Sequence, residues 1–367
     1  MATYRAALIG VGWMGLLYDL AQRMGVWHVD DIDRPTPTLN IHRQFHYHEQ
    51  HLPRARPTSY AVALQDRPEV ELVAAAERDP KRLKAFGERY DIDALYTDAL
   101  AMLQSERPEI VAIATNTKGR ADLTCCAVEN GARGIITEKP IAYTLEEAYR
   151  MVGACAAAGV PLVTGAISTS HPSFGKAKEL VYSGAISKLV SIEAVSDKNM
   201  SQHQNWSYFV DSAPAWVIGL GDEPKRESGS AEYRGQGMMA TAAGEAVFFR
   251  REAPALRLSG SSGEILHQTP YGPWQLWQKL ATAAGEQQVE VSWPEPQMQQ
   301  GGGAVYGVAD LIDCIENRLD EPKNSGRRVA MALEVEIAIK LSAASNSTRI
   351  DLPLEDRSLG LEYDWHR

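Results

Sequence analysis

The sequence predicts two domains of different classes: an N-terminal α/β domain with a doubly wound parallel sheet, and an α+β domain with a mostly antiparallel sheet. Three observations support this prediction. Short apolar runs alternate with helical patterns in the first half, and strand-like runs follow one another directly in the second half. The length of 367 residues also corresponds to about two domains of average size.

Five short apolar runs mark the expected strands of the first domain, at residues 6–9, 72–76, 110–114, 134–137 and 160–163. Helical patterns separate them; one opens at Asp79 and runs to Tyr90, and another begins with a capping signal at Thr144. Apolar strands separated by helices are typical of a parallel sheet that is buried on both faces. The first domain is therefore expected to span residues 1–165.

The pattern changes after about residue 187. Strand-like runs now follow at residues 189–194, 238–249, 255–258, 264–267 and 288–293. Helical patterns come next, at 305–318 and 328–344, and the tail from 348 to 367 looks mostly irregular. Consecutive strands followed by helices are typical of an α+β domain, which is expected to span residues 166–367.

A segment at about residues 27–57 fits this scheme poorly. It lies between the first two strands and is longer than a βα connection needs. It contains four histidines, His42, His46, His48 and His51. Their spacing does not match the zinc motif HExxH, so we expect no metal site. The segment is interpreted as an insertion that forms a substrate loop or an interface arm, or else a solvated stretch.

The charge balance excludes several classes of partner. The chain has 37 Lys and Arg against 47 Asp and Glu, a net charge of −10, with no dense basic tract, which disfavours nucleic acid and anionic membranes. No apolar run approaches the roughly 18 residues of a spanning helix, and no signal peptide is recognisable. The four cysteines, two of them adjacent, predict neither disulfides nor a metal site. A cytoplasmic, reduced protein is expected.

A glycine-rich turn follows the first strand, where residues 10–15 read Gly-Val-Gly-Trp-Met-Gly. In this GxGxxG pattern, the first glycine permits the tight turn, the second lets a pyrophosphate approach the backbone, and the third lets the helix pack on the strand. The free N–H groups of the helix start then bind the phosphates. This context predicts a dinucleotide-binding Rossmann domain. The expected cofactor contacts are Gly10, Gly12, Trp13, Met14 and Gly15.

An acidic residue is expected at the end of the second strand of such a domain. Glu77 occupies that place, although it lies well beyond the usual spacing of about 20 residues, and the segment at 27–57 accounts for much of the excess. A carboxylate there would accept the ribose hydroxyls and repel a 2′-phosphate, which favours NAD. Arg78 would instead pair with that phosphate, so NADP is the alternative.

Further motifs follow in a fixed order along the chain. They are Thr115-Asn116-Thr117, Glu138-Lys139-Pro140, residues 184–189 (Gly-Ala-Ile-Ser-Lys-Leu), residues 260–263 (Gly-Ser-Ser-Gly) and residues 351–354 (Asp-Leu-Pro-Leu). Together with the glycine-rich turn, they resemble the glucose–fructose oxidoreductase/inositol dehydrogenase (Gfo/Idh/MocA) family over nearly the whole chain. Ser187 departs from the pattern, because it replaces a glycine.

The resemblance implies a Rossmann domain followed by an α+β domain with a large, open-faced, mostly antiparallel sheet. Relatives form dimers or tetramers through this sheet, so a homodimer or homotetramer is expected. Cofactor contacts are also expected from Thr115, Asn116, Thr117, Arg120, Glu138 and Lys139.

Lys139 is the first candidate catalytic residue. It follows the fourth strand, and ligands of parallel sheets bind at the carboxyl ends of the strands. Near a positively charged nicotinamide its ammonium form would be disfavoured, which lowers its pKa. The amine would then accept the proton of a reacting hydroxyl. The resemblance implies that this lysine contacts both substrate and cofactor.

A second catalytic residue is expected in the α+β domain, where the family carries a His within G-x-H-x-x-D. Residues 201–206 match best and supply His203 as a proton relay. Ser201 replaces the glycine and Trp206 replaces the Asp; Asp211 is a possible substitute carboxylate. Trp206 is expected to stack on a sugar ring or an aromatic substrate, and His171 to face the substrate.

These observations predict an NAD(P)-dependent oxidoreductase that acts on a secondary alcohol of a sugar, an inositol-like cyclitol or a related polyol. Lys139 would act as acid and base, with His203 assisting. Two alternatives stay open. One is an NAD-dependent enzyme that cleaves glycosides by oxidation and elimination, and the other is a non-catalytic dinucleotide-binding regulator of the same fold.

Overall fold

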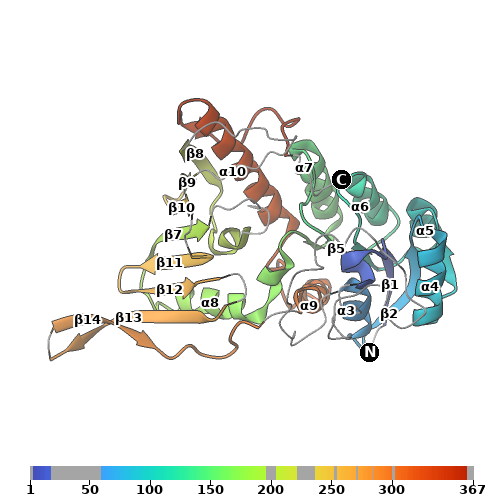
Figure 1. Ribbon diagram of the computed structural model, residues 1–367, viewed down its shortest axis with the longest axis horizontal. Helices are drawn as coiled ribbons and strands as arrows, with labels where there is room; N and C mark the ends of the chain where they lie inside the picture. Colours follow the sequence, from blue (N-terminus) through green and yellow to red (C-terminus); the bar gives the residue numbers. More distant parts are fainter. Residues whose placement is uncertain are drawn as a thin grey trace. The chain divides into compact units, whose positions relative to one another are not determined.

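The computed structural model describes residues 3–17, 59–195, 204–220, 236–251, 254–269, 272–283, 285–299 and 302–361. The chain divides into two compact units (Figure 1). Unit 1 contains residues 1–142, 147–170 and 300–326, and unit 2 contains residues 143–146, 171–299 and 327–367.

Unit 1 is built on a six-stranded sheet in the order β3-β2-β1-β4-β5-β6, with all neighbours parallel. Its strands are β1 (Tyr4–Ile9), β2 (Val70–Ala76), β3 (Ala94–Tyr96), β4 (Ile110–Ile113), β5 (Gly134–Thr137) and β6 (Leu162–Val163). This order confirms the predicted doubly wound sheet. Strands are added on one side of β1 as far as β3 and then on the other side from β4 onward. The carboxyl ends of the strands therefore share one edge.

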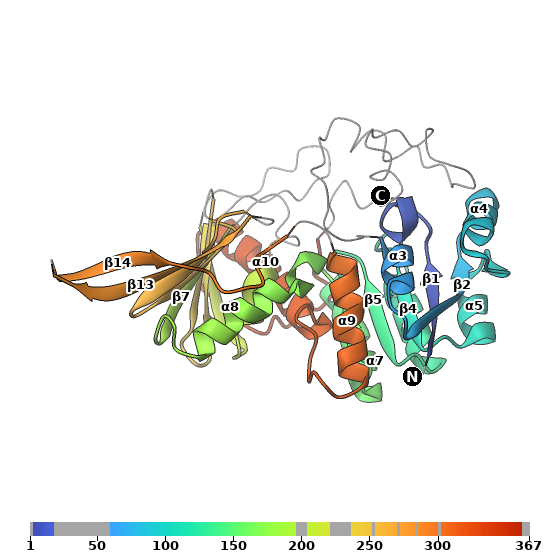
Figure 2. The same cartoon turned by 90° about the horizontal axis from the view of Figure 1, so that it is seen from below.

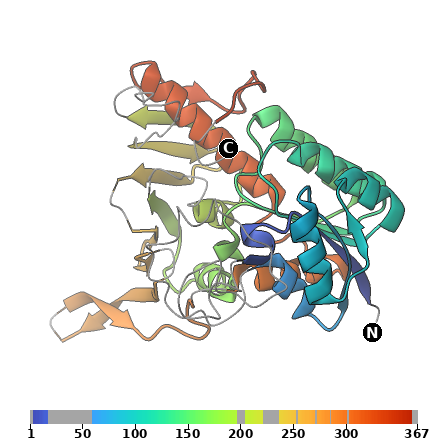
Figure 3. The same ribbon diagram turned by 45° about the vertical axis from the view of Figure 1, so that its right-hand side comes forward.

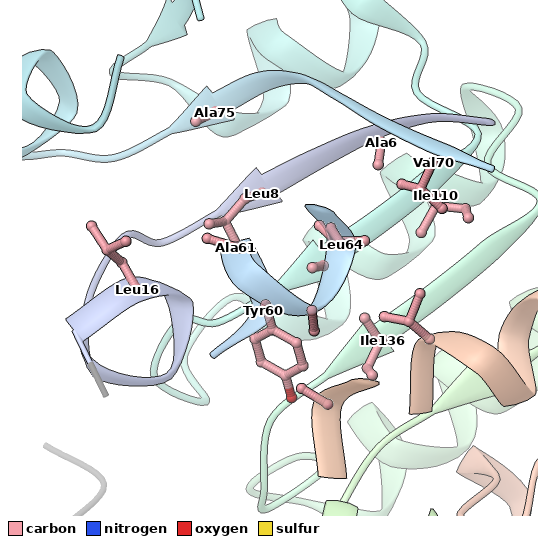
Figure 4. Packing of buried hydrophobic residues seen from close by; sticks show 14 of the residues in the cluster. Ala6, Leu8, Leu16, Tyr60, Ala61, Leu64, Val70, Ala75, Ile110 and Ile136 are labelled. Atoms are coloured by element: carbon pink, nitrogen blue, oxygen red, sulfur yellow. The ribbon is translucent and has the colours of Figure 1, made fainter. Parts of the chain in front are cut away.

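Helices cover this sheet, and two of them begin after an aspartate whose side chain caps the helix. They are α3 (Tyr60–Gln65), α4 (Pro80–Tyr90), α5 (Ala99–Glu106), α6 (Arg120–Glu129) and α7 (Leu145–Ala158). The predicted helix up to Tyr90 is confirmed: the Asp79 side chain accepts hydrogen bonds from the N–H groups of Lys81 and Arg82. Figure 4 shows Leu8 of β1, Leu64 of α3 and Ile136 of β5 in the apolar cluster.

A helix from the second half of the sequence also packs on unit 1. This helix, α9 (Gly303–Ile315), contacts α3 and β5 and lies beside them (Figure 2). Its buried side chains Val308, Leu311 and Ile312 join the core of unit 1. The compact units thus differ from the expected division at residue 165. The apolar pattern of a helix shows that one face is buried, but it does not indicate which sheet that face will cover.

Unit 2 carries a nine-stranded sheet in the order β14-β13-β12-β11-β7-β10-β9-β8-β15. Among the described strands of this sheet, only the β7–β10 pair is parallel, so the expected mostly antiparallel sheet is confirmed. The strands are β7 (Leu189–Val195), β8 (Pro214–Leu220), β9 (Gln236–Thr241), β10 (Ala246–Arg250), β11 (Leu256–Gly260), β12 (Gly263–His267), β13 (Trp274–Thr282), β14 (Gly285–Val291) and β15 (Ile350–Asp351).

Two helices accompany this sheet, α8 (Pro172–Tyr182) and α10 (Gly326–Ala344). The long red helix α10 runs along the sheet of unit 2 (Figure 3). It approaches β8 very closely: the Gly219 N–H donates to Ser342 Oγ at 2.8 Å, and a Cβ at Gly219 would lie 2.0 Å from the Ile339 carbonyl oxygen. Only glycine fits at this crossing. No helix in the described part of the chain is long and apolar enough to span a bilayer.

Candidate active site at the strand ends of unit 1

The glycine-rich turn leaves β1 in the geometry that a dinucleotide needs. Gly10 has a φ of +90°, and its N–H donates to the Ala76 carbonyl at 2.8 Å. A Cβ at Gly10 would lie 2.8 Å from the Ala114 oxygen, and one at Gly15 would lie 2.0 Å from the Gly10 oxygen. Side chains are therefore excluded at these two positions. These residues fit a bound pyrophosphate.

The two residues between Gly12 and Gly15 have other surroundings. Trp13 is buried and Met14 is half-buried, and both pack against the apolar cluster of unit 1. The short helical turn that starts at Trp13 is described as far as Leu17. The expected insertion at about 27–57, with its histidines, lies outside the described residues.

Glu77 lies directly against the glycine-rich turn, despite its distance in sequence. Its carboxylate oxygen Oε2 accepts the Val11 N–H at 3.0 Å, and Oε1 accepts the Asp79 N–H at 3.2 Å. The side chain is half-buried, whereas the neighbouring Arg78 is exposed. Glu77 thus directly follows β2, and its carboxylate lies against the turn at the end of β1.

Arg120 is the best-buried charged side chain at this edge, with an exposed fraction of 1%. Its Nη1 donates to the Glu138 carbonyl at 2.6 Å and to the Pro140 carbonyl, and its Nη2 donates to the Thr115 carbonyl at 2.5 Å. One guanidinium therefore connects the loops that follow β4 and β5. It holds the backbone on both sides of Lys139. Sequence reasoning placed Arg120 among the cofactor contacts and missed this role.

The other predicted cofactor contacts after β4 differ in their exposure. Asn116 is exposed and Thr117 is buried. The Thr115 hydroxyl donates to the Asn116 carbonyl at 2.9 Å.

The Glu138-Lys139-Pro140 motif follows β5 at the same edge. The Glu138 Oε2 accepts the Lys139 N–H at 3.3 Å, and its Oε1 accepts the hydroxyl of Tyr60 at 2.7 Å. Burial lowers the pKa of Lys139; the Glu138 charge raises it, and the Arg120 charge lowers it further. Lys139 is thus an amine that loses its proton more readily than an exposed lysine. No sequence motif points to Tyr60, because Glu138, which accepts its hydrogen bond, lies 78 residues away in the chain.

The residues that were expected to face the substrate lie in unit 2. His171 caps α8, where its Nδ1 accepts the Ser173 N–H at 3.1 Å, and its exposed fraction is 2%. Trp206 is also 2% exposed and packs edge-on against Phe249. Asp211 pairs with Lys178 at 3.0 Å. His203 lies outside the described residues.

The part of the chain that the structure describes contains no candidate metal site. No group of three or more His, Cys, Asp or Glu side chains comes together there in a way that could hold an ion. The chemistry available at the strand edge is that of an amine, a carboxylate and backbone amides.

Part of the chain matches a known protein family. Residues 55–166 match the Gfo/Idh/MocA model, an oxidoreductase family with an NAD-binding Rossmann fold. A D-apiose dehydrogenase from Paraburkholderia graminis is 43% identical over 93 residues, which cover 25% of this chain and 24% of the relative. The match thus spans about a quarter of that relative's length.

Solved structures resemble the chain over almost its whole length. The aldose–aldose oxidoreductase from Caulobacter crescentus has a TM-score of 0.65 at 18% identity and covers 95% of this chain and 100% of its own. A levoglucosan dehydrogenase in complex with NADH and L-sorbose has a TM-score of 0.65 at 19% identity, and the match covers 96% of this chain and 100% of that structure's chain. At this identity the likeness shows the fold. The segment 55–166 therefore resembles the NAD-binding Rossmann domain of Gfo/Idh/MocA oxidoreductases.

Proposed function

We propose that the chain is an NAD(P)-dependent oxidoreductase that transfers hydride between nicotinamide and a CH–OH group of a sugar, cyclitol or related polyol. The observation that carries the proposal is Lys139, an amine of lowered pKa at the end of β5. The glycine-rich turn and Glu77 lie at the same edge of the sheet. The sugar dehydrogenase and oxidoreductases among the similar proteins support a sugar-like substrate.

NAD is the cofactor that these residues fit best. Backbone N–H groups of the turn at residues 10–15 would bind the pyrophosphate. The Glu77 carboxylate already lies against the Val11 N–H, and from there it would accept ribose hydroxyls and repel a 2′-phosphate. The exposed Arg78 beside it is the one feature that favours NADP.

The proposed mechanism uses Lys139 as the general base in the direction of oxidation. Bound NAD supplies the hydride acceptor. The neutral amine of Lys139 accepts a hydrogen bond from the substrate hydroxyl and takes its proton onto Nζ while the carbon loses hydride and the C=O bond forms. The reverse reaction returns the proton from the ammonium to the carbonyl oxygen. We assign His203 the second acid–base role, and His171 a place near the substrate.

A cofactor-reduction screen tests this function. The purified chain is incubated with NAD or NADP and a panel of aldoses, inositols, other polyols and glycosides, and NADH or NADPH is read by absorbance. We expect reduction with at least one sugar or polyol and a higher kcat/KM with NAD. A clear preference for NADP would overturn the cofactor assignment, and the absence of turnover with the whole panel would contradict the oxidoreductase.

The same screen separates the two alternative functions. Release of the free sugar from a glycoside without net NADH formation would indicate a cycle of oxidation, elimination and hydride return. NAD binding without any turnover would favour a dinucleotide-binding regulator. A base at Lys139 supports an enzyme over a regulator, because a regulator needs no amine of lowered pKa beside its cofactor.

We also propose that copies of the chain associate through the sheet of unit 2. One face of this sheet carries the partly exposed Phe248 and a row of ion pairs in which Glu193 lies 2.9 Å from Arg250 and 3.5 Å from Arg257. Such a row of apolar and charged groups suits a face that meets a second copy. Sedimentation velocity should show a dimer or tetramer at micromolar concentration, and a monomer would contradict this.

A further inference from the structure

Tyr60 is a buried tyrosine whose hydroxyl reaches the motif that carries Lys139. It is the first residue of α3, its exposed fraction is 0%, and its ring lies in the apolar cluster of unit 1 (Figure 4). A buried hydroxyl needs a partner, and this one donates to Glu138 Oε1 at 2.7 Å. Burial raises the pKa of Tyr60 well above its usual value, and the Glu138 charge raises it further. The hydroxyl therefore keeps its proton and acts as the donor.

The Glu138 carboxylate is thereby held at both oxygens. Tyr60 binds Oε1, and the Lys139 N–H donates to Oε2 at 3.3 Å. The Glu138 carbonyl is fixed separately by the buried guanidinium of Arg120. The position of this negative charge is thus set by Tyr60 on one side and by the motif's own backbone on the other.

The position of that charge matters because it acts on the amine of Lys139. Among the described residues, Glu138 favours the ammonium form of Lys139 and Arg120 disfavours it. Tyr60 itself stays neutral. A carboxylate that moved closer to the amine would strengthen the ammonium form, and its removal would weaken it.

We propose that Tyr60 is a positioning residue: its hydroxyl anchors the Glu138 carboxylate and so keeps it from forming a closer ion pair with Lys139. This inference rests on the proposed function, in which Lys139 must be neutral to act as the base. The hydroxyl would tune the base without touching substrate or cofactor. Its effect should pass through Glu138 alone.

The test uses variants that should move the titration of Lys139 in opposite directions. In Tyr60→Phe the carboxylate loses its donor and can approach the ammonium, so the pKa of Lys139 should rise by about 1 unit, a usual size for a closer opposite charge. In Glu138→Gln the charge is gone, so the pKa of Lys139 should fall. The double variant should behave like Glu138→Gln, because the hydroxyl then has no charge to position.

Two measurements follow the titration. Competitive acetylation of the intact protein at a series of pH values, read by mass spectrometry of the peptide with Lys139, gives its pKa without any turnover. The pH profile of kcat/KM gives the pKa of the same group during catalysis. The acidic limb of this profile should shift to higher pH in Tyr60→Phe. Tyr4→Phe is the matched control, because Tyr4 is also buried and donates to a carboxylate, that of Glu316, at 3.2 Å.

The outcomes separate this inference from the proposed function. An unchanged Lys139 titration in Tyr60→Phe, or a shift in the same direction as in Glu138→Gln, would overturn the positioning role. If the titrations shift as expected and no substrate turns over, the positioning role stands and the proposed function fails. Glu138→Asp provides a second route if Tyr60→Phe does not fold, since a shorter carboxylate leaves the hydroxyl and should also raise the pKa of Lys139.

Discussion

Replacing Lys139 by Met should abolish hydride transfer and leave NAD binding intact. Methionine has a similar length and no basic group, so the substrate hydroxyl keeps its proton. The expected fall in kcat is about 10²–10⁴-fold, the usual contribution of a positioned acid or base. Arg120 holds the backbone of the motif and Tyr60 holds the Glu138 carboxylate, and neither contact involves the Lys139 side chain. The dissociation constant of NADH, measured by fluorescence titration, should therefore change little.

A control and a pH profile sharpen this test. Lys84→Met removes an exposed lysine of α4, which pairs with Glu88 at 3.4 Å, and should keep full activity. In the unchanged protein, kcat/KM for oxidation should rise with pH through the lowered pKa of Lys139, because only the neutral amine accepts a proton. This rise should disappear in Lys139→Met. Turnover close to that of the unchanged protein would refute the mechanism.

Replacing Arg120 by Met should cause the largest loss of stability in unit 1. The change leaves the carbonyls of Thr115, Glu138 and Pro140 without the guanidinium that binds them. Each buried acceptor that loses its partner costs about 1–3 kcal/mol, so the three carbonyls together give an expected loss of about 3–9 kcal/mol. The measurement is the urea midpoint of unfolding. Activity should fall as well, because both sides of Lys139 lose their support.

The matched control is Arg133→Met, also in unit 1. Arg133 is about half exposed and pairs with Glu109 at 3.1 Å, and such surface pairs contribute about 0–1 kcal/mol. In Arg120→Lys, one ammonium can bind fewer of the three carbonyls than the guanidinium. The urea midpoint of this variant should therefore lie between those of Arg120→Met and the unchanged protein. Equal midpoints for Arg120→Met and Arg133→Met would contradict the role of Arg120.

Local patterns predicted most of the elements because their causes are local. The helix after Asp79 begins where its side chain caps it, and the apolar strands of unit 1 are buried on both faces. Four strands were missed: β3 has three residues and β15 only two, β8 begins with Pro214, and the second half of β13 is exposed. Such strands are stabilised by their neighbours in the sheet rather than by their own pattern.

The sequence by itself determined the glycine-rich turn, the Lys139 motif and the parallel sheet that carries both. The turn and the motif depend on residues close together in the chain, and the sheet was predicted from the alternation of local strand and helix patterns. Only the tertiary structure decided that Glu77 meets Val11, that Arg120 spans two loops and that Tyr60 binds Glu138. These contacts need atoms within about 3 Å. That proximity arises because β1 lies between β2 and β4, with β5 beyond β4, an order of strands that no local pattern contains.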